Sequence, residues 1–311
     1  MDVIAEGLAF PEGPIAMPDG SVVLVELAGG RLTRVGTDGT ISVIADLGGG
    51  PNGAAIGPDG HVYVCNNGGF DDVTDPSGQF ASRMPRTYVG GSIQRVNLET
   101  GESEKLYQNC NGHELRGPND IIFDEHGGFW FTDLGKTWSR SHDHGGVYYA
   151  SAGGSNIQEV IYPLNTPNGI GLSPDGAILY VAETITGKLY QWNVIGPGQL
   201  ETTGGSRPRG ELLFALPGGL RFDSLAVDSA GFINVAVLER GAIAGNAGGI
   251  CEISPDGEGR IIETGDPMTT NICFGGKEYR TAFITCSDSG TLRSFPWPRE
   301  GMKLPFFDKA F

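Results

Sequence analysis

The sequence has little basic charge and no long hydrophobic run. Its 311 residues include 21 Lys and Arg against 37 Asp and Glu, a formal net charge of −16. Nucleic acids and anionic membrane surfaces both attract a basic face, so this balance argues against either as a partner. No stretch approaches the ~18 apolar residues of a membrane span. Residues 1–10, MDVIAEGLAF, lack the basic and apolar regions of a signal peptide.

Cysteine is also scarce, and the common catalytic motifs are absent. The five cysteines are widely spaced and include no C-x-x-C pair. We interpret them as buried thiols in a reducing compartment and expect a cytoplasmic protein. The sequence contains no EF-hand loop, no H-E-x-x-H pair, no P-loop and no G-x-S-x-G elbow, so a serine esterase is unsupported.

Glycine and proline, by contrast, are abundant. The 51 Gly and 19 Pro together are roughly twice the average usage. This composition excludes a helical bundle or a coiled coil. The apolar residues, 39% of the chain, fall in short regular runs, which argues against disorder. No window shows an apolar period of 3.6 residues, so we expect very little helix.

One unit recurs six times along the chain. Each copy has a polar residue, an apolar run, a turn such as Pro-Asp-Gly, a second strand, and a glycine turn into a third strand. Asp-Gly and Gly-Gly turns between short β-branched runs indicate β-hairpins, because such turns need positive φ. The copies begin at Pro11, Pro51, Pro118, Pro167, Phe222 and Thr270.

A fourth short strand closes each of the first five units. These strands are expected at Ile41–Asp46, Ser103–Gln108, Gln158–Tyr162, Glu211–Leu216 and Gly259–Thr264. Four strands are the content of a propeller blade. The sixth unit has no such strand after Phe295, whereas Asp2–Ala5 precedes Glu12 as the other closing strands precede their polar residues. We therefore predict an all-β, six-bladed β-propeller, a single domain over residues 1–311, with its last blade closed by the N-terminal strand.

A carboxylate or amide heads every unit. For any one of these residues the simpler interpretation is a turn former, as in the Asn-Gly pairs. Because the first strand of each blade lines the central channel, the set predicts six polar side chains on one axis. Carboxylates and amides together form an all-oxygen shell, which favours Ca²⁺, Mg²⁺ or Mn²⁺ over Zn²⁺ or Fe²⁺. The six are Glu12, Asn52, Asn119, Asn168, Asp223 and Asn271.

Four motifs around these positions resemble those of a known family. They are PEGP at Glu12, RGPNDI at Asn119, PNGI at Asn168 and FDSLAVD at Asp223. Their order and spacing resemble the senescence marker protein/gluconolactonase/luciferin-regenerating-enzyme (regucalcin-like) family over nearly the whole chain. The resemblance implies that Glu12, Asn168 and Asp223 bind one divalent metal, and that Asn119 beside it coordinates the ion or holds substrate. It also suggests that the segment Phe70–Gly90 forms part of a rim or lid.

The same resemblance implies metal-dependent hydrolysis of a sugar lactone to the aldonic acid, with Ca²⁺ the most expected ion. Asp223 is the candidate base and Asn119 a candidate catalytic and substrate-binding residue. Arg116 either meets the substrate at the channel mouth or is a surface arginine. Two alternatives stay open: a phosphotriesterase of the diisopropyl-fluorophosphatase type, and a non-catalytic calcium-binding propeller. The expected partner is a small-molecule lactone, and the sequence makes no prediction of oligomeric state.

Overall fold

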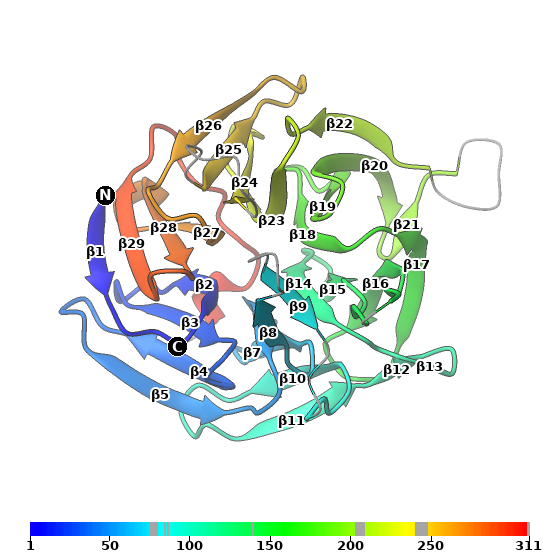
Figure 1. The fold of residues 1–311 in the computed structure, drawn as a ribbon, viewed down its shortest axis with the longest axis horizontal. Helices are drawn as coiled ribbons and strands as arrows, with labels where there is room; N and C mark the ends of the chain where they lie inside the picture. The colour runs from blue at the N-terminus through cyan, green and yellow to red at the C-terminus, as the bar shows by residue number, and fades with distance from the viewer. Residues whose placement is uncertain are drawn as a thin grey trace.

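Six antiparallel four-stranded sheets stand around one axis (Figure 1). The computed structural model describes residues 1–74, 80–83, 85, 87–138, 140–202, 209–239 and 248–309, with the backbone alone at 71–74 and 80–83. The sheets are the blades of a six-bladed β-propeller, numbered here one to six from the N-terminal side. The fold predicted from the repeats is confirmed.

The first three blades follow the order of the repeats. Blade one is β2 (Pro11–Ala16), β3 (Val22–Glu26), β4 (Arg31–Val35) and β5 (Ile41–Asp46). Blade two is β6 (Pro51–Ile56), β7 (Val62–Asn66), β10 (Ser92–Val96) and β11 (Ser103–Tyr107). Blade three is β14 (Pro118–Phe123), β15 (Gly128–Asp133), β16 (Gly145–Ser151) and β17 (Ile157–Leu164).

The last three blades complete the ring. Blade four is β18 (Pro167–Leu172), β19 (Ile178–Glu183), β20 (Lys188–Gly196) and β22 (Glu211–Ala215), with β21 (Gln199–Leu200) beside β20. Blade five is β23 (Leu220–Val227), β24 (Ile233–Glu239), β25 (Gly249–Ile253) and β26 (Gly259–Glu263). Blade six is β27 (Thr269–Gly275), β28 (Thr281–Cys286), β29 (Thr291–Pro296) and the N-terminal β1 (Asp2–Ala5).

Smaller elements decorate the blades. Two short hairpins extend from blades two and three, β8 (Asp71–Thr74) with β9 (Phe80–Arg83), and β12 (Asn109–Cys110) with β13 (His113–Glu114). In Figure 1 the first of these hairpins projects over the centre of the ring. Two three-residue 3₁₀ segments, η1 (Lys277–Tyr279) and η2 (Phe307–Lys309), are the helical elements of the described chain. No helix there is long and apolar enough to cross a membrane.

Local chemistry explains why the hairpins form where the repeats predict them. In the Pro-Asp-Gly turn of blade one, Gly20 has a φ of 85°, which a residue with a Cβ adopts only at a cost. The side chain of Asp19 accepts a hydrogen bond from the backbone N–H of Ser21 at 2.9 Å and so holds the turn closed. The same Pro-Asp-Gly turn recurs between the first two strands of blades two and four.

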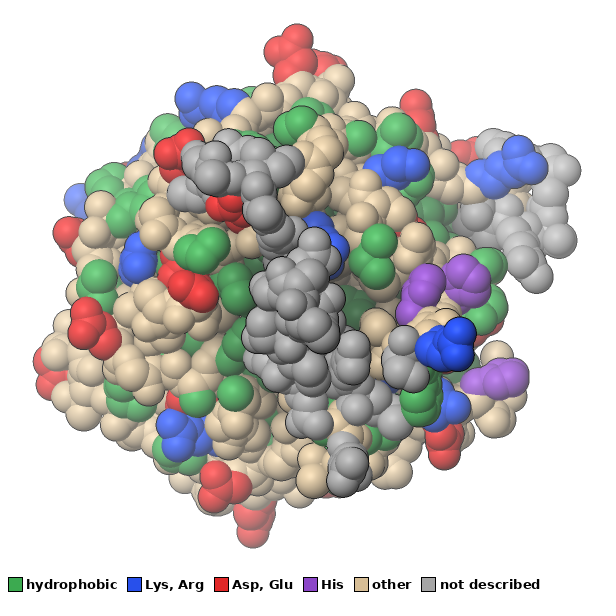
Figure 2. Space-filling view, in the orientation of Figure 1, with side chains coloured by type: hydrophobic (Ala, Val, Ile, Leu, Met, Phe, Trp, Pro, Cys, Tyr) green, Lys and Arg blue, Asp and Glu red, His purple; other side chains and the backbone are tan. Residues whose placement is uncertain are grey.

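The core lies between the blades. Phe129 and Phe131 point from blade three toward Tyr63 of blade two, whereas Trp130, between them in the sequence, packs toward blade four. This alternation is the expected geometry of a strand buried on both faces. Acidic side chains are scattered around the periphery of the face in Figure 2 rather than gathered into one patch. The net negative charge therefore marks no single binding surface on that face.

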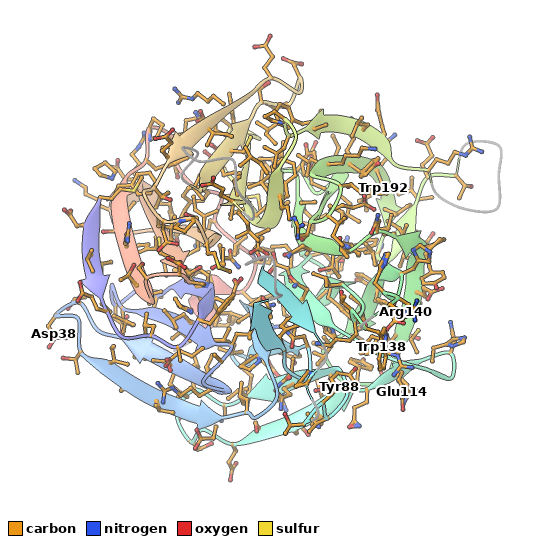
Figure 3. All side chains as sticks on the ribbon, viewed as in Figure 1. Asp38, Tyr88, Glu114, Trp138, Arg140 and Trp192 are labelled. Carbon is orange, nitrogen blue, oxygen red and sulfur yellow. The ribbon has the colours of Figure 1, made fainter. Side chains whose placement is uncertain are left out.

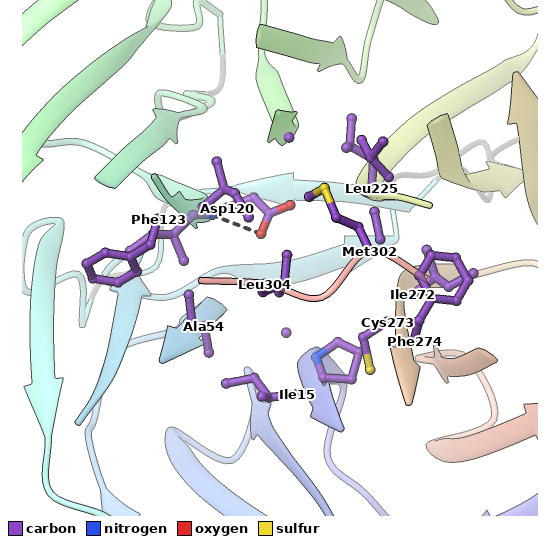
Figure 4. Close-up of a pocket in the computed structure, with 18 of the residues that line it drawn as sticks. Ile15, Ala54, Asp120, Phe123, Leu225, Ile272, Cys273, Phe274, Met302 and Leu304 are labelled. Atoms are coloured by element: carbon purple, nitrogen blue, oxygen red, sulfur yellow. Dashed lines mark hydrogen bonds between the residues drawn. The ribbon is translucent and has the colours of Figure 1, made fainter. Parts of the chain in front are cut away.

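The C-terminal segment does not belong to any repeat. After β29 the chain turns back and runs across the far end of the central channel, where Met302 and Leu304 line the cavity (Figure 4). The backbone N–H of Gly301 donates to the carbonyl of Tyr279 at 2.9 Å, and the ring of Phe306 packs edge-on against Phe123 at 6.0 Å. The segment therefore plugs the end of the channel opposite the polar residues.

The N-terminal strand closes the ring, as predicted. β1 pairs antiparallel with β29, with Asp2 opposite Ser294 and Val3 opposite Arg293. Deletion of residues 1–6 should lower the free energy of unfolding by several kcal/mol, because it exposes the edge of β29 and removes the buried Ala5. Urea denaturation of the truncated protein measures this loss. Val3→Ala, which keeps the strand and changes an exposed side chain, is the control, and equal stability of the truncated and full chains would contradict the closure.

Candidate metal centre

The six polar residues that head the repeats lie in the inner strands, and all six are buried. Neighbouring inner strands contact one another around the axis. Hydrogen bonds link residues of adjacent blades: the Asn271 amide donates to Glu12 Oε2 at 3.3 Å, and the Asn168 amide donates to Asp223 Oδ1 at 2.5 Å. The structure thus brings together the residues that the repeats aligned, which we call the polar ring.

A β-bulge accompanies the polar residue in each blade. The pairing between the inner strand and the next strand shifts register between Glu12 and Ile15 in blade one, across the polar residue in blades two to five, and between Thr269 and Asn271 in blade six. A bulge re-aims a side chain and bends its strand locally. The Asn-Gly pairs at Asn52 and Asn168 therefore lie inside strands and not in turns, so the simpler interpretation of these two residues does not hold.

Glycines let the inner strands approach closely beside the ring. A Cβ on Gly13 would lie 2.4 Å from the carbonyl oxygen of Asn52, and one on Gly53 would lie 2.5 Å from that of Asn119. A Cβ on Gly169 would lie 2.7 Å from the carbonyl oxygen of Asp223. The missing side chains bring the ring residues of adjacent blades within reach of one small ligand.

Two of the ring residues follow strained backbone. Phe10 has a φ of 58° and Thr166 a φ of 54°, and each stands two positions before a ring residue, Glu12 and Asn168. A β-branched residue such as Thr166 rarely adopts this conformation. The Thr166 hydroxyl accepts a hydrogen bond from the N–H of Ile185 at 3.0 Å, which helps to hold the strained segment. Strain of this kind is concentrated at functional sites.

The electrostatics of the ring favour a cation. Burial raises the pKa of Glu12 well above its usual value, and the negative charges of Asp223 and then Asp120 raise it further. Burial likewise raises the pKa of Asp120 to about 7, although backbone N–H groups of Ile121, Ile170 and Leu225 oppose this effect. Buried carboxylates that repel one another are stabilised when a cation lies between them.

Unsatisfied amide oxygens provide the second argument for an ion. Asn52 Oδ1 and Asn119 Oδ1 are buried and accept no hydrogen bond, which is costly unless a cation or water reaches them. Asn271 Oδ1 differs, because it accepts the N–H of Ile272 at 2.8 Å. Among the described residues no three His, Cys, Asp or Glu side chains are grouped to hold a metal. An ion on this axis must therefore take amide oxygens together with Glu12 and Asp223, and the residues fit a hard divalent cation.

Asn168 is oriented by its neighbours. Its side-chain nitrogen donates to Asp223 Oδ1 and to the hydroxyl of Thr184 at 3.0 Å, which fixes the amide plane. Its Oδ1 faces only a weak donor, the Ser224 hydroxyl at 3.4 Å. The carbonyl of Asn168 accepts from the Thr132 hydroxyl at 2.6 Å, so blade three also holds this strand. The amide oxygen is therefore available as a ligand.

The structure does not bring every candidate residue to the ring. Arg116 is 43% exposed, its guanidinium bonds Glu114 at 2.9 Å, and it lines a hollow that contains no ring residue. Of the segment Phe70–Gly90, residues 75–79, 84 and 86 lie outside the described part of the chain.

Sequence reasoning missed Lys136, which is 1% exposed. Its Nζ donates to the carbonyl of Gly69 at 2.9 Å and to Asn67 Oδ1 at 3.4 Å, and it lies over the ring of Phe70 at 3.9 Å. The ring of Tyr88 is 5.3 Å away and lies in the region where blades two and three meet (Figure 3). Lys136 thus lies close to the rings of both Phe70 and Tyr88, which flank the β8–β9 hairpin in the sequence. No repeat or motif marks it, because its partners come from another blade.

Beyond the polar ring the channel is apolar. Figure 4 shows Ile15, Ala54, Leu225 and Ile272 around the cavity, with Asp120 as the acidic side chain among them. Asp120 Oδ1 accepts the N–H of Ile121 at 3.0 Å. The channel therefore has a polar end, where the ring residues lie, and an apolar end that the C-terminal segment closes.

Comparisons with known proteins agree with this architecture. A family model described as the SMP-30/Gluconolactonase/LRE-like region matches residues 10–288. A gluconolactonase of Zymomonas mobilis is 25% identical over 92% of this chain and 79% of its own length. Lactonase drp35 of Staphylococcus haemolyticus is 30% identical over 76% of this chain and 66% of its own length. The crystal structure of a calcium-binding protein, regucalcin, from Agrobacterium tumefaciens superposes with a TM-score of 0.75 at 17% identity, covering 98% of this chain and 96% of that one.

The close approach of the inner strands can be tested at Gly53. Gly53→Ala should destabilise the protein by about 1–3 kcal/mol, because the added methyl would overlap the backbone of Asn119 and Asp120 and force the strands apart. Gly153→Ala is the matched control, since nothing lies within 4 Å of its added Cβ. Urea denaturation compares the two. Equal stability of the two variants would contradict the packing described here.

The buried Lys136 predicts a pH dependence of stability. Burial lowers its pKa from 10.5 to about 7, although Asp133 partly opposes this. Between these values the unfolded chain binds a proton that the folded chain has released, so the free energy of unfolding should rise with pH. Lys136→Met should remove this rise, whereas Lys303→Met, at an exposed lysine, should keep it. Denaturation at a series of pH values measures the slope, and an unchanged slope in Lys136→Met would contradict the assignment.

Proposed function

The chain belongs to the SMP-30/gluconolactonase/LRE-like family, and we propose that it is a metal-dependent lactonase that hydrolyses a sugar lactone to the aldonic acid. The observation that carries this proposal is the polar ring, with two buried carboxylates and unsatisfied amide oxygens on one axis. The relatives named gluconolactonase and lactonase support the reaction class.

We assign the ion to Glu12, Asn168 and Asp223, with Asn119 beside them. These are oxygen donors with a combined formal charge of −2, which suits Ca²⁺ best and also accommodates Mg²⁺ or Mn²⁺. The structural relative described as calcium-binding supports the same choice. Asn52 is a further candidate ligand, because its Oδ1, like Asn119 Oδ1, is buried and accepts no hydrogen bond. A bound divalent ion supplies Lewis acidity toward the lactone carbonyl.

The residues of the chain account for binding and proton transfer. The Oδ1 atoms of Asn119 and Asn52 are buried acceptors. Each of them that does not coordinate the ion accepts a hydrogen bond from a substrate hydroxyl. Asp223 accepts the proton of the attacking water as the water oxygen bonds to the carbonyl carbon. The bond from that carbon to the ring oxygen then breaks, and the proton passes to the ring oxygen, which leaves as a hydroxyl group. Asn168 holds Asp223 in position through its 2.5 Å hydrogen bond.

The ligand assignment predicts which variants lose the ion. Glu12→Gln and Asp223→Asn should each weaken divalent-ion binding at least about ten-fold, because each removes one negative charge while keeping the shape of the side chain. Asn271→Ala should bind nearly as the wild type does, since Asn271 Oδ1 already accepts a backbone N–H. Calorimetric titration of chelator-stripped protein with Ca²⁺ decides this. Equal losses in all three variants would refute the assignment.

The reaction itself is tested with a panel of sugar lactones and one phosphotriester, followed by proton release at constant pH. Lactone hydrolysis that a chelator abolishes and Ca²⁺ restores is the expected result. Asn119→Ala should keep most of the ion affinity and lose turnover. Hydrolysis of the phosphotriester alone would favour a phosphotriesterase. Ion binding without any turnover would favour a calcium-binding propeller with no catalytic role.

A further inference from the structure

A second hollow lies outside the channel, at the junction of blades three and four. It has a volume of about 960 Å³ and runs between β17 and β20, with Arg209 and Gly210 just before β22 at its side. None of the six ring residues lines it. We call it the side groove, and its principal lining residues are Tyr162, Asn165, Glu183, Tyr190, Trp192 and Arg209.

Aromatic rings form one part of the side groove. Trp192 and Tyr190 pack with ring centroids 6.0 Å apart on β20, and Trp192 lies in blade four in Figure 3. Tyr162 stands on the rim with 45% of its surface exposed. Aromatic side chains with a polar handle are favoured where a ligand presents an apolar face and hydroxyl groups together. Tyr162 and Tyr190 thus offer ring surface to the groove, and the buried Trp192 packs beside Tyr190.

Unsatisfied polar atoms form the other part. Trp192 is 4% exposed, and its Nε1 has no acceptor. Asn165 Oδ1 is buried and has no donor. A buried donor and a buried acceptor without partners each cost stability, so a ligand that satisfies both is favoured. A hydroxyl group both donates and accepts, and a sugar ring carries several of them.

The charges of the side groove indicate a neutral ligand. Glu159 and Glu183 line it together with Arg209, so carboxylates outnumber guanidinium groups and an anionic ligand is disfavoured. Glu183 Oε1 accepts the N–H of Asn165 at 2.7 Å, which fixes the end of the groove nearest the ring. From these rings, unsatisfied atoms and charges, we propose that the side groove binds a neutral carbohydrate.

The groove is structurally close to the polar ring without being part of it. Asn165 stands three positions before Asn168, separated from it by the strained Thr166. Thr184, which follows Glu183, accepts the Asn168 amide at 3.0 Å. A carbohydrate held in the side groove therefore rests on the same segment that carries a candidate metal ligand. The proposal does not depend on lactone hydrolysis, because the ring contributes no group to the groove.

The test is calorimetric titration of chelator-stripped protein with glucose, maltose and cellobiose. At least one saccharide should bind, and Trp192→Phe should weaken it about five-fold, since the variant keeps an aromatic ring and loses the N–H donor. Trp297→Phe is the matched control: Trp297 is 3% exposed, its Nε1 also lacks a partner, and it does not line the groove. Binding should persist in Asp223→Asn, which separates this site from the ring.

A second pair of variants keeps the proposal testable if Trp192→Phe fails to fold. Tyr162→Ala removes an exposed ring from the groove and should also weaken the binding of the saccharide. Trp138→Ala removes a ring that is 38% exposed and lies elsewhere, and it should bind as the wild type does. Absence of binding for all three saccharides would overturn the proposal. So would equal weakening in a groove variant and its control, or loss of binding in Asp223→Asn.

Discussion

Burial, and after it the negative charge of Asp223, raises the pKa of Glu12, so the centre of the molecule holds two buried carboxylates that repel each other. They are held in place by the closure of the ring. Glu12 belongs to blade one and its amide partner Asn271 to blade six, so their 3.3 Å hydrogen bond spans the joint between the first and last blades. The hydroxyl of Ser287 adds a bond to the carbonyl of Pro11 at 2.8 Å across the same joint. These two bonds hold the start of the inner strand of blade one against blade six.

The channel has a polar end and an apolar end, and residues only a few positions apart on the same inner strand line the two. Glu12 faces the polar ring, whereas Ile15 of the same strand lines the apolar cavity. The β-bulge between them makes this change possible, because it interrupts the regular alternation of side chains. The C-terminal segment then covers the apolar end with Met302 and Leu304. Apolar side chains therefore border one side of the ring, and electrostatic interactions are stronger in such surroundings than in water.

The sequence predicted the blades well because their signals are local. Turn residues such as Gly20 and short apolar runs set the strand positions, and the alignment of the repeats correctly placed all six polar residues on the inner strands. The unpredicted features depend on contacts between distant parts of the chain. Lys136 is defined by Gly69 and Phe70 of another blade. The C-terminal plug follows no repeat, and its Phe306 packs against Phe123 of blade three. The β-bulges could not be predicted either, because a bulge is a shift in strand pairing and the pairing exists only in the folded sheet.

A fold of near six-fold symmetry produces an asymmetric site through small differences between blades. The residue after the polar position is glycine in blades one, two and four, but Asp120, Ser224 and Ile272 occupy it in the others. Asp120 adds a third acidic group below the ring. Asn271, between the blades of the two carboxylates, donates its amide to Glu12 and uses its oxygen on its own strand. On the opposite side Asn52 and Asn119 keep unsatisfied oxygens. The unsatisfied acceptors are thus gathered on blades two and three, on the side of the ring opposite Asn271.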